Sequence, residues 1–174
     1  MHFTLEHTFS GITLAEYETL YFDEAFSEEM CAAVKVGRTL LRLDRQPGLL
    51  TRHVRCEPIR DLPGPVSALL GGRRFAYVEE LEFDLGKGEG RWRVIPNVAS
   101  EKVDAGGTLH FEAVPGGGGV KRIVRGEIAF SLFGVGRIVE RFVVAEVEKS
   151  YEDASRFTRA YLERTKHQET RGKG

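Results

Sequence analysis

The chain has 174 residues, of which 41% are hydrophobic and 29% are charged, and its formal net charge is −1. These values are ordinary for a soluble globular protein, and the length suits one domain with a sizeable core. A net charge so close to zero gives no general positive field, so nucleic acid is not expected as a partner. No apolar run reaches the roughly 20 residues that span a membrane, so stable membrane insertion is not expected either.

The N-terminal segment and the cysteines indicate a cytoplasmic protein. Residues 1–6 lack the basic stretch and apolar core that a secretory signal needs. Cys31 and Cys56 do not have the spacing of a metal site, and two thiols cannot form a disulfide framework. We therefore expect both cysteines to be reduced, as thiols are in the cytosol.

The first forty residues predict a strand followed by two short helices. Thr13 can cap the first helix, with Glu16 in the capping-box position three residues later. Apolar residues at helical spacing predict the second helix over residues 23–36, and Gly37 ends it. The strand is predicted by alternation, since every second residue can face a core: Phe3, Leu5, His7 and Phe9.

The middle of the chain predicts antiparallel strands joined by short loops. Glycine and proline residues mark the turns at 46–48, 86–90 and 116–119. A short helix is expected at residues 66–70, after a segment rich in proline. The expected strands cover residues 38–44, 49–57, 75–85, 91–96, 108–114 and 120–132.

One long amphipathic helix is expected from residue 136 to residue 166, and it ends the domain. Residues 1–166 are therefore predicted to form a single α+β domain, and residues 167–174 a polar, flexible tail. The apolar side of the helix is predicted to consist of Ile138, Val139, Phe142, Val143, Ala145, Val147, Tyr151, Ala154, Phe157 and Tyr161.

This order of elements resembles the helix-grip fold of the START and birch-pollen-allergen superfamily (SRPBCC). Within it, residues 61–66 (DLPGPV) and 133–140 (FGVGRIVE) are similar to the domain of unknown function 2505 family. The resemblance covers essentially the whole chain. It implies a curved antiparallel sheet of about seven strands wrapped around the C-terminal helix, with two short helices after the first strand. It also implies an apolar cavity for lipids, sterols, polyketides or similar ligands, used by some members for catalysis and by others for binding or carriage.

We expect this cavity to be lined by alternate residues of the strands and by the apolar side of the helix. The inward orientation of Phe142 assumes that Ile138 and Ala145 share its side of the helix. A slip of one residue in a strand would turn every strand side chain to the opposite face. The predicted lining comprises Phe3, Leu5, His7, Trp92, Phe111, Phe142 and Val143.

Two motifs suggest a nucleotide or a metal, and neither is complete. Gly134 and Gly136 lie between a strand and a helix, but Val139 stands at the third glycine position and no strand follows the helix. A tight turn explains these glycines better. His110 and Glu112 share one strand face and could supply two metal ligands, but a third is not evident. No cofactor and no metal are therefore expected.

Adjacent glutamates offer the best candidate for acid-base chemistry. Glu79 and Glu80 face opposite sides of a strand, so one of them points inward. An inward carboxylate near His7 could transfer protons, or it could pair with an inward arginine such as Arg42 or Arg93. No nucleophile motif is present, so no catalytic residue is assigned.

The leading prediction is binding of a hydrophobic small molecule or lipid in the cavity, for carriage or sensing. The first alternative is an enzyme of the polyketide cyclase, dehydratase or hydrolase type that uses the same cavity. The second is a protein-interaction module without a ligand. Paired polar residues facing inward would favour the enzyme. A purely apolar lining would favour the carrier, and a collapsed interior would favour the interaction module.

Overall fold

The computed structural model describes residues 1–59, 64–131, 134 and 136–171, so parts of the two motifs at 61–66 and 133–140 and the end of the tail lie outside it. A single seven-stranded antiparallel sheet has the order β1-β7-β6-β5-β4-β3-β2, with β1 and β2 at its edges. The strands are β1 (His2–Ser10), β2 (Val36–Gln46), β3 (Leu49–Pro58), β4 (Tyr77–Asp84), β5 (Glu89–Pro96), β6 (Val103–Ala113) and β7 (Gly119–Phe130).

The four α-helices lie near their expected positions, but the second one ends at Ala33, because Val36 and Gly37 already belong to β2, and the 3₁₀ turn was not expected. Thr13 and Glu16 form the expected capping box at the start of α1. The long helix continues to Arg171, past the expected end at Lys166. The helices are α1 (Leu14–Tyr21), α2 (Glu24–Ala33), α3 (Gly64–Leu70), the 3₁₀ turn η1 (Ser100–Lys102) and α4 (Gly136–Arg171).

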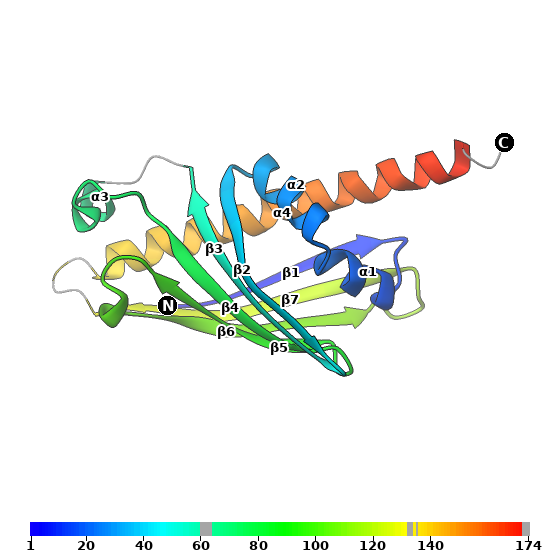
Figure 1. The fold of residues 1–174 in the computed structure, drawn as a ribbon, viewed down its shortest axis with the longest axis horizontal. Helices are drawn as coiled ribbons and strands as arrows, with labels where there is room; N and C mark the ends of the chain where they lie inside the picture. The colour runs from blue at the N-terminus through cyan, green and yellow to red at the C-terminus, as the bar shows by residue number, and fades with distance from the viewer. Residues whose placement is uncertain (60–63, 132–133, 135, 172–174) are drawn as a thin grey trace.

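The long helix α4 lies across one face of the curved sheet, and α1 and α2 cover the same face beside its second half (Figure 1). Aromatic rings join α2 to α4, with the centroids of Phe26 and Tyr161 5.0 Å apart. The bidentate ion pair between Arg38 and Glu24, at 2.6 and 3.0 Å, holds α2 against β2. The α+β helix-grip architecture is therefore confirmed.

The alternation expected for β1 is present. Phe3, His7 and Phe9 are buried on the concave face, and Leu5 packs against the same core. Phe111 on β6 is 1% exposed, within a cluster of aromatic rings from α1 and the sheet. Hydrophobic burial on this face therefore fixes the register of the strands.

The predicted apolar side of α4 is wrong near its start. Ile138 is 60% exposed and Ala145 is also exposed, whereas Val139 and Val144 are buried. Apolar residues occur on more than one side of these first turns, so periodicity alone does not select the buried side. Contact with the sheet selects it, and Phe142 then lies half-buried at its flank.

Candidate functional site

A cavity of about 210 Å³ lies between the concave face of the sheet and the first half of α4. We call it the sheet–helix cavity. Most of its wall is apolar, and α3 and the segment before β4 add to it. Its lining comprises Phe3, Pro58, Leu70, Phe75, Tyr77, Glu79, Trp92, Val94, Pro96, Val98, Ala99, Val103, Ala105, Ile128, Phe130, Val139, Phe142, Val143, Glu146, Val147, Ser150 and Tyr151.

Two glycines form part of the sheet beneath this cavity. Across four neighbouring strands, Trp92 pairs with Gly107, Gly107 with Gly126, and Gly126 with Phe3. The rings of Phe3 and Trp92, with centroids 6.2 Å apart, lie over Gly126, where an added methyl group would come within 2.4 Å of one ring and 2.6 Å of the other. The missing side chains let both rings lie close to the sheet, which leaves space above them.

One wall of the cavity is polar. Tyr77 and Glu79 alternate on β4, and Tyr151 faces them from α4. Arg52 on β3 donates to Oε1 of Glu79 at 3.3 Å. Burial raises the pKa of Tyr77 and Tyr151 well above the usual phenol value, and the nearby Glu79 carboxylate adds to both rises. These phenols are therefore neutral hydrogen-bonding groups at neutral pH.

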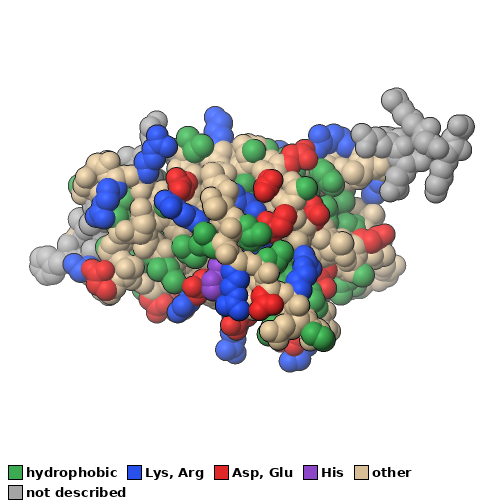
Figure 2. Space-filling model, in the orientation of Figure 1, with side chains coloured by type: hydrophobic (Ala, Val, Ile, Leu, Met, Phe, Trp, Pro, Cys, Tyr) green, Lys and Arg blue, Asp and Glu red, His purple; other side chains and the backbone are tan. Residues whose placement is uncertain are grey.

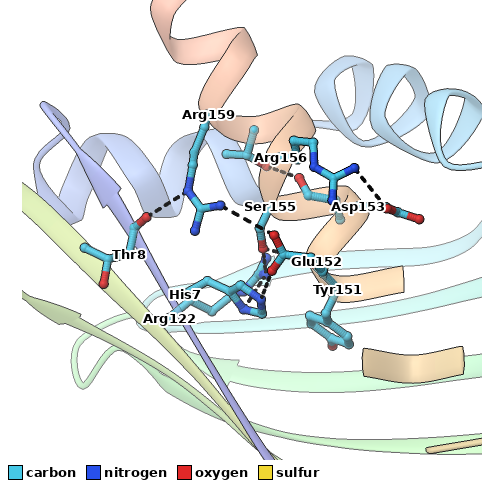
Figure 3. Close-up of polar contacts among 11 residues, drawn as sticks. His7, Thr8, Arg122, Tyr151, Glu152, Asp153, Ser155, Arg156 and Arg159 are labelled. Atoms are coloured by element: carbon cyan, nitrogen blue, oxygen red, sulfur yellow. Dashed lines mark hydrogen bonds and ion pairs between the residues drawn. The ribbon is translucent and has the colours of Figure 1, made fainter. Parts of the chain in front are cut away.

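A second polar group lies beneath the middle of α4, and Figure 3 shows it. We call it the Arg122 cluster; it comprises His7, Arg122, Tyr151, Glu152 and Ser155. Arg122 is 3% exposed and donates to Ser155 Oγ at 2.7 Å. Its guanidinium also lies 5.0 Å from the ring centroid of Tyr151, a residue that also lines the cavity. Tyr151 thus belongs to both the cavity wall and the Arg122 cluster.

The hydrogen bonds of His7 define its protonation. Arg122 Nη2 lies 3.3 Å from His7 Nδ1, and an arginine can only donate, so Nδ1 must accept. His7 Nε2 lies 3.4 Å from Glu152 Oε2, so the proton on Nε2 faces a carboxylate oxygen. The ring is therefore neutral. Burial lowers the pKa of His7, the charge of Arg122 lowers it further, and Glu152 offsets part of the change.

The residues predicted from the sequence to line the cavity fall into two groups. Phe3, Trp92, Phe142 and Val143 line the sheet–helix cavity. Leu5 and Phe111 belong to the packed core, and His7 belongs to the Arg122 cluster. The cavity thus lies toward one end of the concave face, and aromatic side chains fill the part beneath α1.

Sequence reasoning missed the two buried arginines. The structure pairs Glu79 with Arg52, rather than with Arg42 or Arg93. Glu80 lies on the other side of β4 and pairs with the exposed Arg93 at 2.6 Å. A signal was available, because Arg52 alternates with the apolar residues Leu50 and Val54, and Arg122 with Val120 and Val124. A charged residue within such a row is a candidate for a buried polar group.

Within the described part of the chain, the remaining motifs do not assemble into a further site. His110 and Glu112 are 3.6 Å apart, and Lys121 is also bound to Glu112. Among the described residues, no three His, Cys, Asp or Glu side chains are grouped so that they could hold a metal ion.

Both cysteines are free thiols. No helix in the described part of the chain is long and apolar enough to cross a membrane. Basic and acidic side chains intermingle on the face seen in Figure 2.

A protein-family model described as "Protein of unknown function (DUF2505)" matches residues 4–162. The chain belongs to this family. The match includes β1 from Thr4 onward, the other six strands and α4 as far as Leu162, so it covers all the lining residues of the sheet–helix cavity except Phe3. No curated protein matches the sequence significantly.

Solved structures share the fold at low sequence identity. TTHA0849 from Thermus thermophilus is 15% identical with a TM-score of 0.60, and the alignment covers 88% of this chain and 91% of that one. A norcoclaurine synthase point mutant from Thalictrum flavum, in complex with a transition-state analogue, is 12% identical with a TM-score of 0.59 and coverage of 94% and 97%. Protein Ms6760 from Mycobacterium smegmatis is 16% identical with a TM-score of 0.53 and coverage of 94% and 92%. These similarities establish the fold of the DUF2505 chain. Any ligand has to be inferred from the geometry and chemistry of the site.

Proposed function

We propose that the protein binds a hydrophobic small molecule, or the apolar end of a lipid, in the sheet–helix cavity, for carriage or sensing. Phe3 and Trp92 would form the floor, and Phe142 and Val143 the helix side of the binding site. The shared fold with ligand-binding proteins of the birch-pollen-allergen type agrees with this proposal. The experiments below concern the cavity of this chain alone.

The observation that carries the proposal is an apolar cavity of about 210 Å³ in an otherwise packed interior. An engineered apolar cavity of about 150 Å³ stays dry and binds benzene, so a space of this size and chemistry admits a small organic molecule. An apolar ligand would regain dispersion contacts that the lining side chains lack while the space is empty. The volume favours a compact ligand, because sites for drug-sized molecules are commonly about 300–1,000 Å³.

An enzyme of the polyketide cyclase, dehydratase or hydrolase type is the second candidate, and Glu79 is the observation that favours it. Glu79, Tyr77 and Tyr151 all line the cavity, so their polar groups could exchange protons with a substrate. The ion pair with Arg52, at 3.3 Å, holds the carboxylate of Glu79 in place at this wall. A ligand-free interaction module is less well supported, because the interior contains a cavity.

Native mass spectrometry of the protein purified from its own host tests the proposal. We expect a bound molecule in the unaltered protein and in Ile138→Trp, where the new side chain points outward. In Val143→Trp the larger side chain would fill the cavity, and the bound mass should be lost. Equal occupancy of the two variants, or no bound mass together with no thermal stabilisation by any small apolar compound, would contradict the proposal.

A further inference from the structure

The polar groups of the sheet–helix cavity come from two facing elements. Tyr77 and Glu79 project from the same face of β4. Glu146, Ser150 and Tyr151 come from successive turns of the middle of α4. The other lining side chains are apolar. A ligand with one polar group therefore has one wall on which that group can be satisfied, and its apolar part must occupy the rest of the cavity.

The charged side chains of this wall are carboxylates. Among the described lining residues, Glu79 and Glu146 carry charge, and no lysine, arginine or histidine reaches the lining. The buried guanidinium of Arg52 lies behind Glu79, 5.6 Å from the ring centroid of Tyr21 and equally far from that of Phe22. Because Glu79 lines the cavity and Arg52 does not, the ion pair turns its negative end toward the ligand.

The surroundings of Glu79 suit a cation in other ways. The hydroxyls of Tyr77 and Tyr151 can accept hydrogen bonds from an ammonium group without adding a competing positive charge. Aromatic rings, including those of Phe3, Trp92 and Phe142, form much of the remaining lining, and ring faces attract cations in dry surroundings. An anionic ligand such as a fatty acid would instead place its carboxylate in a cavity whose charged lining groups are carboxylates.

We propose that the ligand of the sheet–helix cavity is a compact apolar molecule that carries a basic nitrogen, with its ammonium group bound by the Glu79 carboxylate. This inference rests on the proposed function, since it requires that the cavity bind an apolar molecule at all. The ammonium group donates to Glu79 and to the tyrosine hydroxyls, and the apolar part lies against Trp92 and Phe142.

Three compounds with the same apolar part test the preference: 4-phenylbutylamine, 4-phenyl-1-butanol and 4-phenylbutyrate. Trp92 is the only tryptophan of the sequence and lines the cavity, so its fluorescence reports binding directly. At neutral pH we expect the amine to bind more tightly than the alcohol by on the order of tenfold, because a hydrogen bond to a charged group is stronger than a neutral one. The carboxylate should bind more weakly than the alcohol.

Substitution of Glu79 gives a sharper test. In Glu79→Gln the affinity for the amine should fall to that for the alcohol, and the carboxylate should gain affinity because Arg52 has lost its partner. Glu80→Gln is the matched control, since it removes the neighbouring carboxylate on the opposite face of β4 and should leave the order of the three compounds unchanged. If Glu79→Gln does not fold, the double variant Arg52→Met/Glu79→Gln removes both charges and should abolish the preference for the amine.

The outcomes distinguish the two proposals. Equal or tighter binding of 4-phenylbutyrate than of 4-phenylbutylamine to the unaltered protein overturns the inference and leaves the proposed function standing. A preference for the amine that survives in the Glu79 variants also overturns it. If none of the three compounds changes the fluorescence of Trp92 or the thermal stability of the protein, the proposed function itself fails.

Discussion

The two polar regions beneath α4 use the same kinds of side chain in different ways. In the Arg122 cluster, the guanidinium is buried among Ser155, His7 and the rings of Phe9 and Tyr151. In the sheet–helix cavity, Glu79 faces a space of about 210 Å³. One region is an enclosed polar network, in which the buried Nε of Arg122 still has no hydrogen-bond partner, and the other leaves a carboxylate where a ligand could reach it.

The difference comes from side-chain volume on the sheet. Beneath α1, the rings of Phe9, Tyr17 and Phe111 pack with centroids 4.9 and 5.1 Å apart. Beneath the first half of α4, the corresponding part of the sheet contains Gly107 and Gly126. The cavity is thus an effect of a few small residues in one row, which makes the comparison between filled and open regions testable by single substitutions.

The largest expected effect is a difference in the loss of stability when each of two phenylalanines is replaced by alanine. The sequence predicts both of them in the cavity lining. Phe111→Ala should destabilise the protein by about 3–5 kcal/mol and lower Tm by roughly 6–20 °C, because Phe111 is fully packed. Phe142→Ala should cost much less, since the half-buried ring borders existing space. Thermal unfolding of both variants checks this, and equal losses would show that Phe142 is core.

Removal of the buried cation should have the next largest effect. Arg122→Met keeps an apolar stem but leaves Ser155 Oγ and His7 Nδ1 without their donor, so we expect a loss of about 1–3 kcal/mol. Arg125→Met, on the exposed side of the same strand, should change stability by less than about 0.5 kcal/mol. Denaturant unfolding measures both. A more stable Arg122→Met variant would show that desolvation of the cation outweighs its contacts.

Adding a single methyl group at Gly126 should reduce the space in the sheet–helix cavity. In Gly126→Ala the new methyl would overlap the rings of Phe3 and Trp92, and we expect it to push these rings into the cavity that they line. We expect several-fold weaker binding of 4-phenyl-1-butanol and a strain of about 1–3 kcal/mol. Gly64→Ala, where an added methyl meets no atom within 4 Å, is the control. Unchanged binding in Gly126→Ala would mean that the cavity does not hold the probe.

Much of this architecture follows from local sequence signals. Alternation, turn residues and the capping box predict the order of strands and helices, because each depends on a few neighbouring residues. The phase of α4 was wrong at Ile138, since apolar residues surround its first turns and only contact with the sheet chooses among them. The partner of Glu79 was also missed, because Arg52 is twenty-seven residues away in sequence and diagonal pairing across β3 and β4 depends on register.

The smallest expected effect concerns the charge of His7 and sharpens the view that the Arg122 cluster is an enclosed network. The groups that face this ring are Arg122 on β7 and Glu152, Ser155 and Arg159 on α4. Burial and the charge of Arg122 lower its pKa below the ordinary value of about 6.5. Between the folded and unfolded pKa values the unfolded chain therefore binds more protons, and stability falls as the pH drops through this window.

Above about pH 6.5 the ring is neutral in both states, so the stability that depends on it is fully present there. We expect the stability advantage of the unaltered protein over His7→Asn to shrink between about pH 7.5 and about pH 5.5. His2→Asn, at an exposed histidine paired with Glu127, should show a smaller change over the same range. Denaturant unfolding at both pH values makes the comparison. A constant advantage would show that folding does not lower the pKa of His7. An advantage that grows on acidification would show that the folded protein favours the charged ring, and the hydrogen bond from Arg122 to Nδ1 would then have to be abandoned.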